Sequence, residues 1–109
     1  MAKLNITNSA KADIKETLSY IKHTLHNPQA ALNLANQISE EFNLLTSHPK
    51  SGPLVNDKFL ANYGIRFLLV KNYKAYYTLF ENDNIITITI IRFLYAKRDY
   101  IKALTSEIK

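Results

Sequence analysis

The first half of the chain carries two stretches in which apolar residues recur every three or four positions. The first reaches from about Ala10 to His26, and the second from Pro28 to His48, where the following proline ends it. This period predicts two amphipathic helices, and Asn27-Pro28 combines a good N-cap with a proline at the first helical position. Their apolar positions are Ala10, Ile14, Leu18, Ile21 and Leu25, then Ala31, Leu34, Ala35, Ile38, Phe42 and Leu45. Because the link is so short, we expect an antiparallel helical hairpin whose stripes can also cover a sheet.

The second half changes to the alternating period that is typical of β-strands. Short polar connections at Lys71-Asn72 and at residues 81–84 separate its strands, which indicates an antiparallel meander. A short alternating segment also precedes the first helix, and Asn8 or Ser9 is expected to cap that helix. Residues 50–56 are expected to form a loop. The expected strands are Lys3–Thr7, Ile65–Val70, Tyr73–Phe80 and Ile85–Ile91, and a short last helix is expected over Arg98–Ile108.

The third strand of the meander has the pattern of a buried, central strand. Ile86, Ile88 and Ile90 share one face, which we expect to lie under the helical hairpin. Thr87, Thr89 and Ile91 share the other face, which continues towards Phe93 and Tyr95. An edge strand this apolar would invite aggregation, so we expect the N-terminal strand or its hairpin mate to flank it. The sequence therefore predicts one α+β domain over residues 1–109, in the order β-α-α-β-β-β-α, with helices on one sheet face.

Composition narrows the class of protein. The chain has 109 residues and no cysteine, so neither disulfides nor thiolate metal sites contribute. We see no secretory signal peptide and no apolar run long enough to span a membrane, and we expect a cytoplasmic location. The net charge of +5 is uneven, because residues 1–56 contribute +1 and residues 57–109 contribute +4. A basic second half favours nucleic acid or an acidic protein as a partner, although solubility alone also explains a modest surplus.

Cations and tyrosines gather on the predicted sheet and at its exit. Arginine suits phosphate, and tyrosine rings can stack on exposed bases. Tyr73, Tyr76 and Tyr77 are instead expected to pack as ordinary sheet aromatics. For Asp99 the sequence leaves two roles open: a salt bridge with Arg98, or a cap of the last helix. The candidate contact residues are Arg66, Lys74, Arg92, Tyr95, Lys97, Arg98 and Tyr100.

Catalysis by this set would be cleavage of RNA through the 2′-hydroxyl. That reaction needs a base, cations for the pentavalent phosphate and an acid for the leaving oxygen. The cations are present, but the base would have to be Tyr95, Tyr100 or a lysine, because the histidines belong to the helical hairpin. His23 and His26 are spaced for one helix face without a third ligand, so we expect no metal site. No cofactor motif is present, since two glycines cannot build a phosphate loop.

The order of these segments resembles the RelE/ParE superfamily of type II toxin–antitoxin toxins over nearly the whole chain. The matching segments are ITNSAKADIKETLSYI, LTSHPKSG and IRFLLVKNYKAYYTLFENDNIITITIIRFLYAKRDY. The resemblance implies a growth-inhibiting toxin, of the kind encoded by plasmid stabilization modules, that a cognate antitoxin neutralises. The basic second half suits an acidic antitoxin.

The superfamily has two main activities, and the resemblance leaves both open. RelE-like members are mRNA interferases, ribosome-dependent endoribonucleases, and here Arg66, Tyr95 and Arg98 would carry that activity. Two departures weaken this interpretation, because no lysine precedes Arg66 in residues 62–65 and Tyr95 stands where related sequences often carry histidine. The long hairpin and the Lys97-Arg98-Asp99 run look more like ParE-like members, which poison DNA gyrase without an established catalytic site. The favoured interpretation is therefore a gyrase inhibitor. An mRNA interferase is the second possibility, and an inactive binding module is the third.

Overall fold

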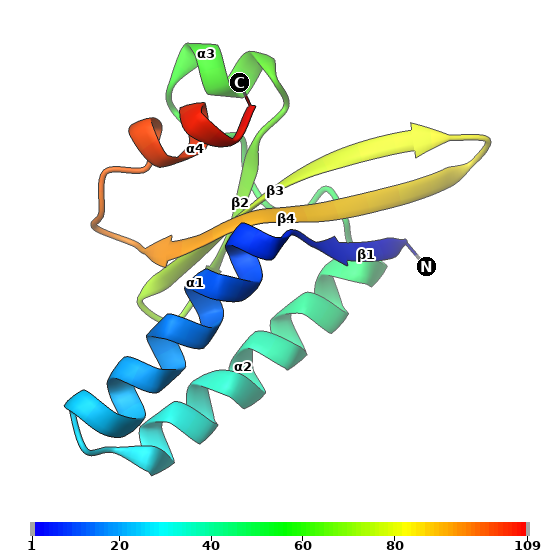
Figure 1. The fold of residues 1–109 in the computed structure, drawn as a ribbon. Helices are drawn as coiled ribbons and strands as arrows, with labels where there is room; N and C mark the ends of the chain where they lie inside the picture. The colour runs from blue at the N-terminus through cyan, green and yellow to red at the C-terminus, as the bar shows by residue number, and fades with distance from the viewer. Residues whose placement is uncertain (1, 109) are drawn as a thin grey trace.

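The computed structural model describes residues 2–108, and its main helices and strands follow one another in the order that the sequence predicts (Figure 1). The predicted α+β class and the β-α-α-β-β-β-α order are confirmed. One short helix, α3, and one π-helical turn, η1, are additional. The elements are β1 (Lys3–Ile6), α1 (Asn8–Ser19), η1 (Tyr20–Thr24), α2 (Pro28–Ser47), α3 (Lys58–Asn62), β2 (Arg66–Val70), β3 (Tyr73–Asn82), β4 (Ile85–Tyr95) and α4 (Ile101–Ile108).

The isoleucine-rich strand β4 lies inside the sheet. The strand order is β1-β4-β3-β2, with β1 parallel to β4 and the other pairs antiparallel. β1 and β3 therefore both flank β4, which removes the apolar edge that isolation would have exposed. Ile88 and Ile90 are fully buried, as predicted for the face under the hairpin.

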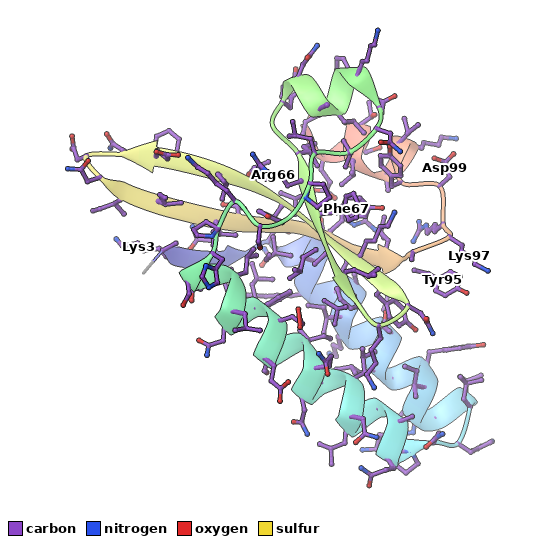
Figure 2. The ribbon with its side chains drawn as sticks, turned by 180° about the vertical axis from the view of Figure 1, so that it is seen from behind. Lys3, Arg66, Phe67, Tyr95, Lys97 and Asp99 are labelled. Atoms are coloured by element: carbon purple, nitrogen blue, oxygen red, sulfur yellow. The ribbon has the colours of Figure 1, made fainter. Side chains whose placement is uncertain are left out.

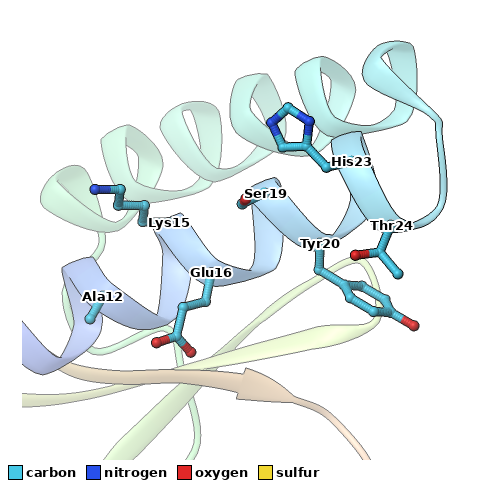
Figure 3. Close-up of a pocket in the computed structure, with 7 residues that line it drawn as sticks. All are labelled: Ala12, Lys15, Glu16, Ser19, Tyr20, His23 and Thr24. Atoms are coloured by element: carbon cyan, nitrogen blue, oxygen red, sulfur yellow. The ribbon is translucent and has the colours of Figure 1, made fainter.

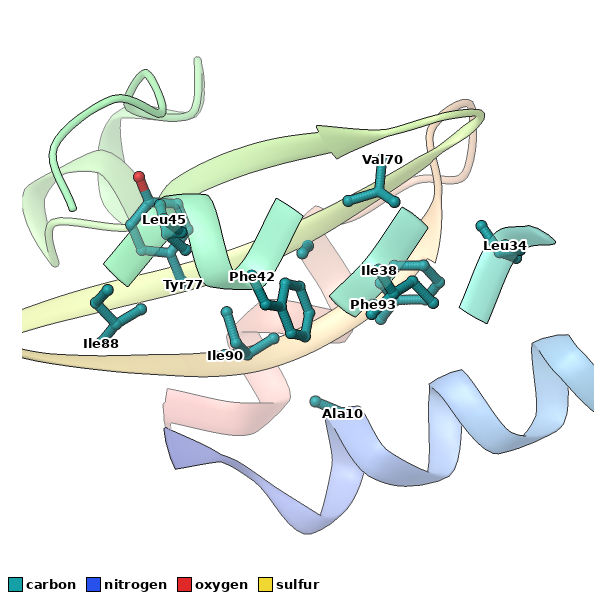
Figure 4. Close-up of a cluster of buried hydrophobic side chains, with 11 residues drawn as sticks. Ala10, Leu34, Ile38, Phe42, Leu45, Val70, Tyr77, Ile88, Ile90 and Phe93 are labelled. Carbon is teal, nitrogen blue, oxygen red and sulfur yellow. The ribbon is translucent and has the colours of Figure 1, made fainter. Parts of the chain in front are cut away.

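The helical hairpin covers one face of the sheet. Asn27 caps α2 as predicted, its side chain accepting the Ala30 N–H at 3.0 Å. The cap of α1 was predicted one or two residues late: Thr7 accepts the Ala10 N–H and also donates to the Ile91 carbonyl, which ties the helix start to β4. The core between hairpin and sheet is drawn in Figure 4, and its buried residues are Ala10, Leu34, Ile38, Phe42, Leu45, Val70, Ala75, Tyr77, Ile88, Ile90 and Phe93.

The opposite face of the sheet is also covered, which corrects the expectation of helices on one face only. The chain between α2 and β2 forms α3, begun by Asp57, whose carboxylate accepts the Leu60 N–H at 3.0 Å. α4 begins at Ile101, three residues later than predicted, and packs beside α3 on this face (Figure 1). The second core consists of Val55, Leu60, Ile65, Tyr76, Leu94 and Leu104. α3 escaped prediction because a helix of five residues gives too little periodicity.

A β-bulge changes which face the end of β4 presents. β4 continues to Tyr95, four residues past its predicted end, and its register with β3 shifts between Tyr76 and Tyr77. Tyr77 pairs with Ile90 and Tyr76 with Arg92, so Ile91 is the extra residue. Phe93 therefore packs under the hairpin with Ile90, and not on the face of Ile91 as the simple alternation predicted.

Candidate functional site: the basic end of the sheet

The seven candidate contact residues do not form one cluster. Figure 2 shows Arg66 near the middle of the molecule, whereas Tyr95 and Lys97 lie at the end of β4. Arg66 pairs with Tyr77, and Tyr95 is level with Tyr73 and Val70. Tyr95 therefore lies level with Val70, four residues along β2 from Arg66, which is about 13 Å along the sheet. The predicted nuclease set of Arg66, Tyr95 and Arg98 is not brought together.

Arg66 holds the loop that follows α2. Its guanidinium donates to the Gly52 carbonyl at 2.7 Å and to the Lys50 carbonyl at 3.4 Å. Tyr77 fastens the same loop, since its hydroxyl accepts the Gly52 N–H and donates to the Pro49 carbonyl, both at 3.0 Å. The donors of Arg66 are thus directed at backbone oxygens, which gives this side chain a structural task.

Arg92 also has a structural task. Its Nε and Nη2 bind the two carboxylate oxygens of Asp13 at 2.6 and 2.9 Å, a bidentate pair between β4 and α1. Nη1 lies 3.6 Å from Glu107 of α4. The hydrogen bond to Asp13 raises the pKa of Arg92 in spite of partial burial. Arg92 therefore joins three elements and offers little to a partner.

Lys74 and Tyr100 lie on the face covered by α4. They line a hollow of about 180 Å³ with Phe67 and Tyr76. The Lys74 ammonium sits 4.4 Å from the centre of the Phe67 ring, a cation–π contact. Tyr100 stacks on Tyr76 at 5.4 Å, and its hydroxyl accepts the Asp57 N–H at 3.1 Å. Of these two candidates, Tyr100 serves the packing of α4, and Lys74 points into the hollow.

The remaining candidates, Tyr95, Lys97 and Arg98, are exposed where β4 ends. Tyr95 is 47% exposed, although its ring meets the Tyr73 ring edge to face at 5.9 Å. Arg98 N–H donates to the Tyr95 carbonyl at 2.9 Å, which closes the turn that presents both cations. Asp99 accepts the Ile101 N–H at 3.1 Å, so it supports the start of α4, one of its two predicted roles.

Lys71 belongs to the same surface and was missed in the sequence. The Ala96 N–H donates to the Asn72 carbonyl at 2.8 Å, so the β2–β3 turn lies beside the turn that follows β4. Lys71 in that turn is exposed and has a φ of 52°. An antiparallel meander places alternate turns at one end of the sheet, and this was the signal that could have found it. We call Lys71, Tyr95, Lys97 and Arg98 the basic end.

A groove of about 530 Å³ separates the basic end from α1. The α1 wall carries Asp13, Glu16, Thr17 and Tyr20, and the sheet wall carries Tyr73, Phe93, Leu94 and Tyr95, with Arg98 at the rim. Figure 3 shows Glu16 and Tyr20 projecting from the helical segment towards the strands, whereas Lys15 and His23 project away from them. Tyr73 forms a flat floor, stacked on Phe93 at 5.2 Å and 14°. The groove is thus an aromatic site with one free carboxylate and one free guanidinium among the residues that line it.

Three sheet tyrosines are protected from ionisation, which predicts alkaline unfolding. Burial, and then the neighbouring Tyr100, raises the pKa of Tyr76 to about 12. Burial also raises the pKa of Tyr73 and of Tyr77 above the ordinary value of 10.0. The unfolded chain therefore releases these protons at lower pH than the folded chain. The contribution of the three tyrosines to the free energy of unfolding is constant below about pH 10 and falls as pH rises from there towards 12. Tyrosinate absorbance measured against pH, beside denaturant unfolding, checks this: the Tyr76→Phe variant should lose less stability in that window.

Within residues 2–108 no group of three or more histidine, aspartate or glutamate side chains is arranged to hold a metal ion. None of the helices in this part of the chain is long and apolar enough to cross a membrane. His23 lies in η1 and His26 has a φ of 52° in the turn that follows, both exposed.

Fold and site together define a small α+β domain with a basic, tyrosine-rich end. The family model described as "ParE toxin of type II toxin-antitoxin system, parDE" matches residues 4–100, so the chain belongs to the ParE toxin family. This confirms the predicted type II toxin. Among solved structures, one described as the chromosomal ParDE TA system from P. aeruginosa is similar with a TM-score of 0.68 and 21% identity, over 89% of this chain and 98% of that one. That likeness supports the fold. None of the curated proteins matches this chain.

Proposed function

We propose that this toxin arrests growth by inhibiting DNA gyrase in the cytoplasm, and that an acidic antitoxin keeps it inactive. The main support is the separation of the residues that a ribonuclease would need. Arg66 binds the Gly52 and Lys50 carbonyls about 13 Å along the sheet from the level of Tyr95. Arg98 lies near Tyr95, in the lining of the same groove, and not near Arg66. Membership of the ParE family favours the gyrase-directed activity over RNA cleavage.

The proposed inhibition works by binding and involves no bond cleavage by the toxin. Lys71, Lys97 and Arg98 project from two adjacent turns, and Tyr95 adds a half-exposed ring between them. Exposed aromatic and arginine side chains are the residue types that anchor protein interfaces. Surrounding positive charge also speeds the encounter with an acidic surface. The basic end is therefore proposed as the target contact, and Lys74 as a lesser contributor on the adjoining face.

Purified wild-type toxin is expected to block supercoiling by gyrase and to leave ribosome-bound mRNA intact. The double variant Lys97→Glu/Arg98→Glu should raise the toxin concentration required by about tenfold or more, because two like-charge contacts would replace two attractive ones. Lys22→Glu, an exposed charge reversal on the helical hairpin, is the matched control and should change little. The measurement is a supercoiling titration, with growth after induction as its counterpart in cells.

Two results would contradict the proposal. One is the absence of any effect on gyrase at high toxin concentration. The other is codon-positioned mRNA cleavage that disappears in Arg98→Ala while the folded fraction, measured by circular dichroism, is unchanged. Arg66→Ala is a poorer test of catalysis, because it also removes the two bonds to the Lys50–Gly52 loop.

A further inference from the structure

Two strands project from the sheet at the end opposite the basic end. β2 begins at Arg66, which pairs with Tyr77, whereas β3 and β4 stay paired as far as Asn82 and Ile85. The turn between them is Asp83-Asn84, with φ of 50° and 67°, which is typical of a tight two-residue hairpin. Figure 1 shows β3 and β4 reaching past the start of β2. Among residues 2–108, no strand pairs with β3 on this side over residues 78–82.

Alternation along β3 shows which backbone groups this edge presents. The Ala96 N–H donates to the Asn72 carbonyl, so Asn72 and the even-numbered residues after it direct their N–H and C=O towards β4. The extra residue of the bulge lies in β4, which leaves the alternation of β3 unbroken. The odd-numbered Tyr77 therefore points to β2, and Leu79 and Glu81 point the same way, beyond the first residue of β2. The N–H and C=O of Leu79 and of Glu81 are thus without a strand partner.

The same edge carries the most exposed large apolar side chain among the described residues. Phe80 is 65% exposed, and Ile85, which is 48% exposed, is its diagonal neighbour on the same face of the hairpin. The side chains of Leu79 and Glu81 project to the other face, where Leu79 packs against the core and Glu81 pairs with Lys50 at 3.1 Å. An exposed ring beside open backbone groups favours pairing with another edge.

The open groups match those of a second copy in one register. A two-fold axis perpendicular to the sheet makes the edges of two copies antiparallel, and residues whose groups face each other then exchange both backbone bonds. With the axis at Phe80, Leu79 of each copy pairs with Glu81 of the other, and every open group is satisfied. With the axis at Leu79, Glu81 would face Tyr77, which already pairs with β2. With the axis at Glu81, two carboxylates would lie directly opposite each other, which is unfavourable.

Phe80 supplies the apolar contact of this register. Because its own N–H and C=O point to β4, the two Phe80 residues form a non-hydrogen-bonded pair, in which the Cα atoms are about 4.5 Å apart. Both rings lie on one face, with Ile85 of each copy beside them, and cross-strand aromatic pairs are stabilising. The contact consists of two hydrogen-bonded pairs and these side chains, so it is small. A transient dimer with a dissociation constant on the order of 100 µM is expected.

We propose that the toxin forms a two-fold dimer through the outer edge of β3, with Leu79 bonded to Glu81 of the second copy and the two Phe80 rings packed at the axis. The two four-stranded sheets then join edge to edge. Tyr95 is level with Tyr73, which lies about 24 Å along β3 from Phe80, so the two basic ends lie roughly 50 Å apart. Both stay accessible, and the dimer offers two contacts in place of one.

Sedimentation equilibrium of the full-length toxin, from about 10 µM to about 1 mM, measures the dimer. The average mass should rise from the monomer value of 12.5 kDa towards twice that value. Amide hydrogen exchange at Leu79 and Glu81 should slow about fourfold across this range, because association covers their N–H groups. The Phe80 amide is already bonded to β4 and should exchange slowly at every concentration. This contrast between neighbouring amides is specific to pairing at the outer edge of β3.

Two variants separate the backbone bonds from the apolar contact. Glu81→Pro removes the outward N–H and leaves the bonds between β3 and β4, so it should weaken the dimer about tenfold or more. Glu81→Ala keeps that N–H and should change the affinity less than about threefold. Phe80→Glu should weaken the dimer about tenfold or more, because two carboxylates then meet at the axis. Phe59→Glu, at a 50% exposed ring on α3, is its matched control.

A toxin that stays monomeric at about 1 mM would overturn the proposal, and so would a dimer that both Glu81→Pro and Phe80→Glu leave intact. Slower exchange at Tyr95 and Arg98, with dissociation in added salt, would show that the acidic turn of one copy contacts the basic end of another, and would reject the two-fold pairing. If circular dichroism showed that Glu81→Pro is unfolded, Phe80→Glu would decide the outcome. The dimer does not depend on gyrase, so failure of the gyrase assay would leave it in place.

Discussion

Replacing Asp13 with alanine is expected to lower the free energy of unfolding by about 3 kcal/mol, because it leaves a largely buried guanidinium without its partner. The side chains of Arg92 and Asp13 are only 16% and 12% exposed, and they meet in a bidentate pair. Asp13 also accepts the Phe93 N–H, so its loss frees a backbone donor at the sheet edge as well. Urea unfolding followed by circular dichroism measures the effect.

Glu107→Gln provides the matched control for this ion pair. Glu107 lies 3.6 Å from Arg92 and is more exposed, at 26%, so its neutralisation should cost less than about 1 kcal/mol. A double-mutant cycle of Asp13→Ala with Arg92→Met should recover part of the loss, because both charges are then removed. Equal losses for Asp13→Ala and Glu107→Gln would show that the pair between α1 and β4 is not the main tie.

The second large effect is expected at Gly52. The substitution Gly52→Ala should lower the free energy of unfolding by about 2–3 kcal/mol, because the added methyl group overpacks its surroundings. An added Cβ would collide with the Phe67 carbonyl oxygen and would lie 2.5 Å from the Tyr77 hydroxyl. The Tyr77 ring would have to move, which breaks its bonds to Gly52 and Pro49 and disturbs the carbonyl that Arg66 binds. Thermal and urea unfolding of Gly52→Ala measure this loss.

Gly64 is the natural comparison, since it is the other glycine of the chain. A Cβ added at Gly64 would meet nothing within 4 Å, but the φ of 77° lies in the left-handed region. Gly64→Ala should therefore lower the free energy of unfolding by only about 1 kcal/mol. If Gly64→Ala proved the more destabilising of the two, the tight packing of the loop around Gly52 would not be what requires glycine there.

Much of the fold followed from local patterns, because periodicity reports burial directly. The stripes of both helices, the Asn27 cap and the central place of the isoleucine strand were all predicted and are confirmed. Leu25 was the exception within a stripe: it is 54% exposed, because the chain widens into a π-helical turn from Tyr20 and Leu25 falls past its end. Nothing in the spacing of apolar residues signals such a widened turn.

The candidate site was less predictable, since whether a cation is free depends on where distant carboxylates and carbonyls lie. Arg92 and Arg98 are six residues apart and look alike in the sequence. Arg92 meets Asp13, seventy-nine residues away, whereas Arg98 stays exposed. Lys71 joined the site only through the contact between two turns. The sequence shows that Lys71 is charged, but not that its turn lies beside the turn that follows β4.

The sequence by itself determined the class of fold, the order of its main elements and most residues of the core under the helical hairpin, because these depend on the period of apolar positions and on short connections. It also carried the resemblance that family membership confirmed. Only the tertiary structure decided how the cations are used, since each pairing closes across the sheet or between helix and strand. It also decided where β1 stops relative to β4, because register is a property of two strands and not of either one alone.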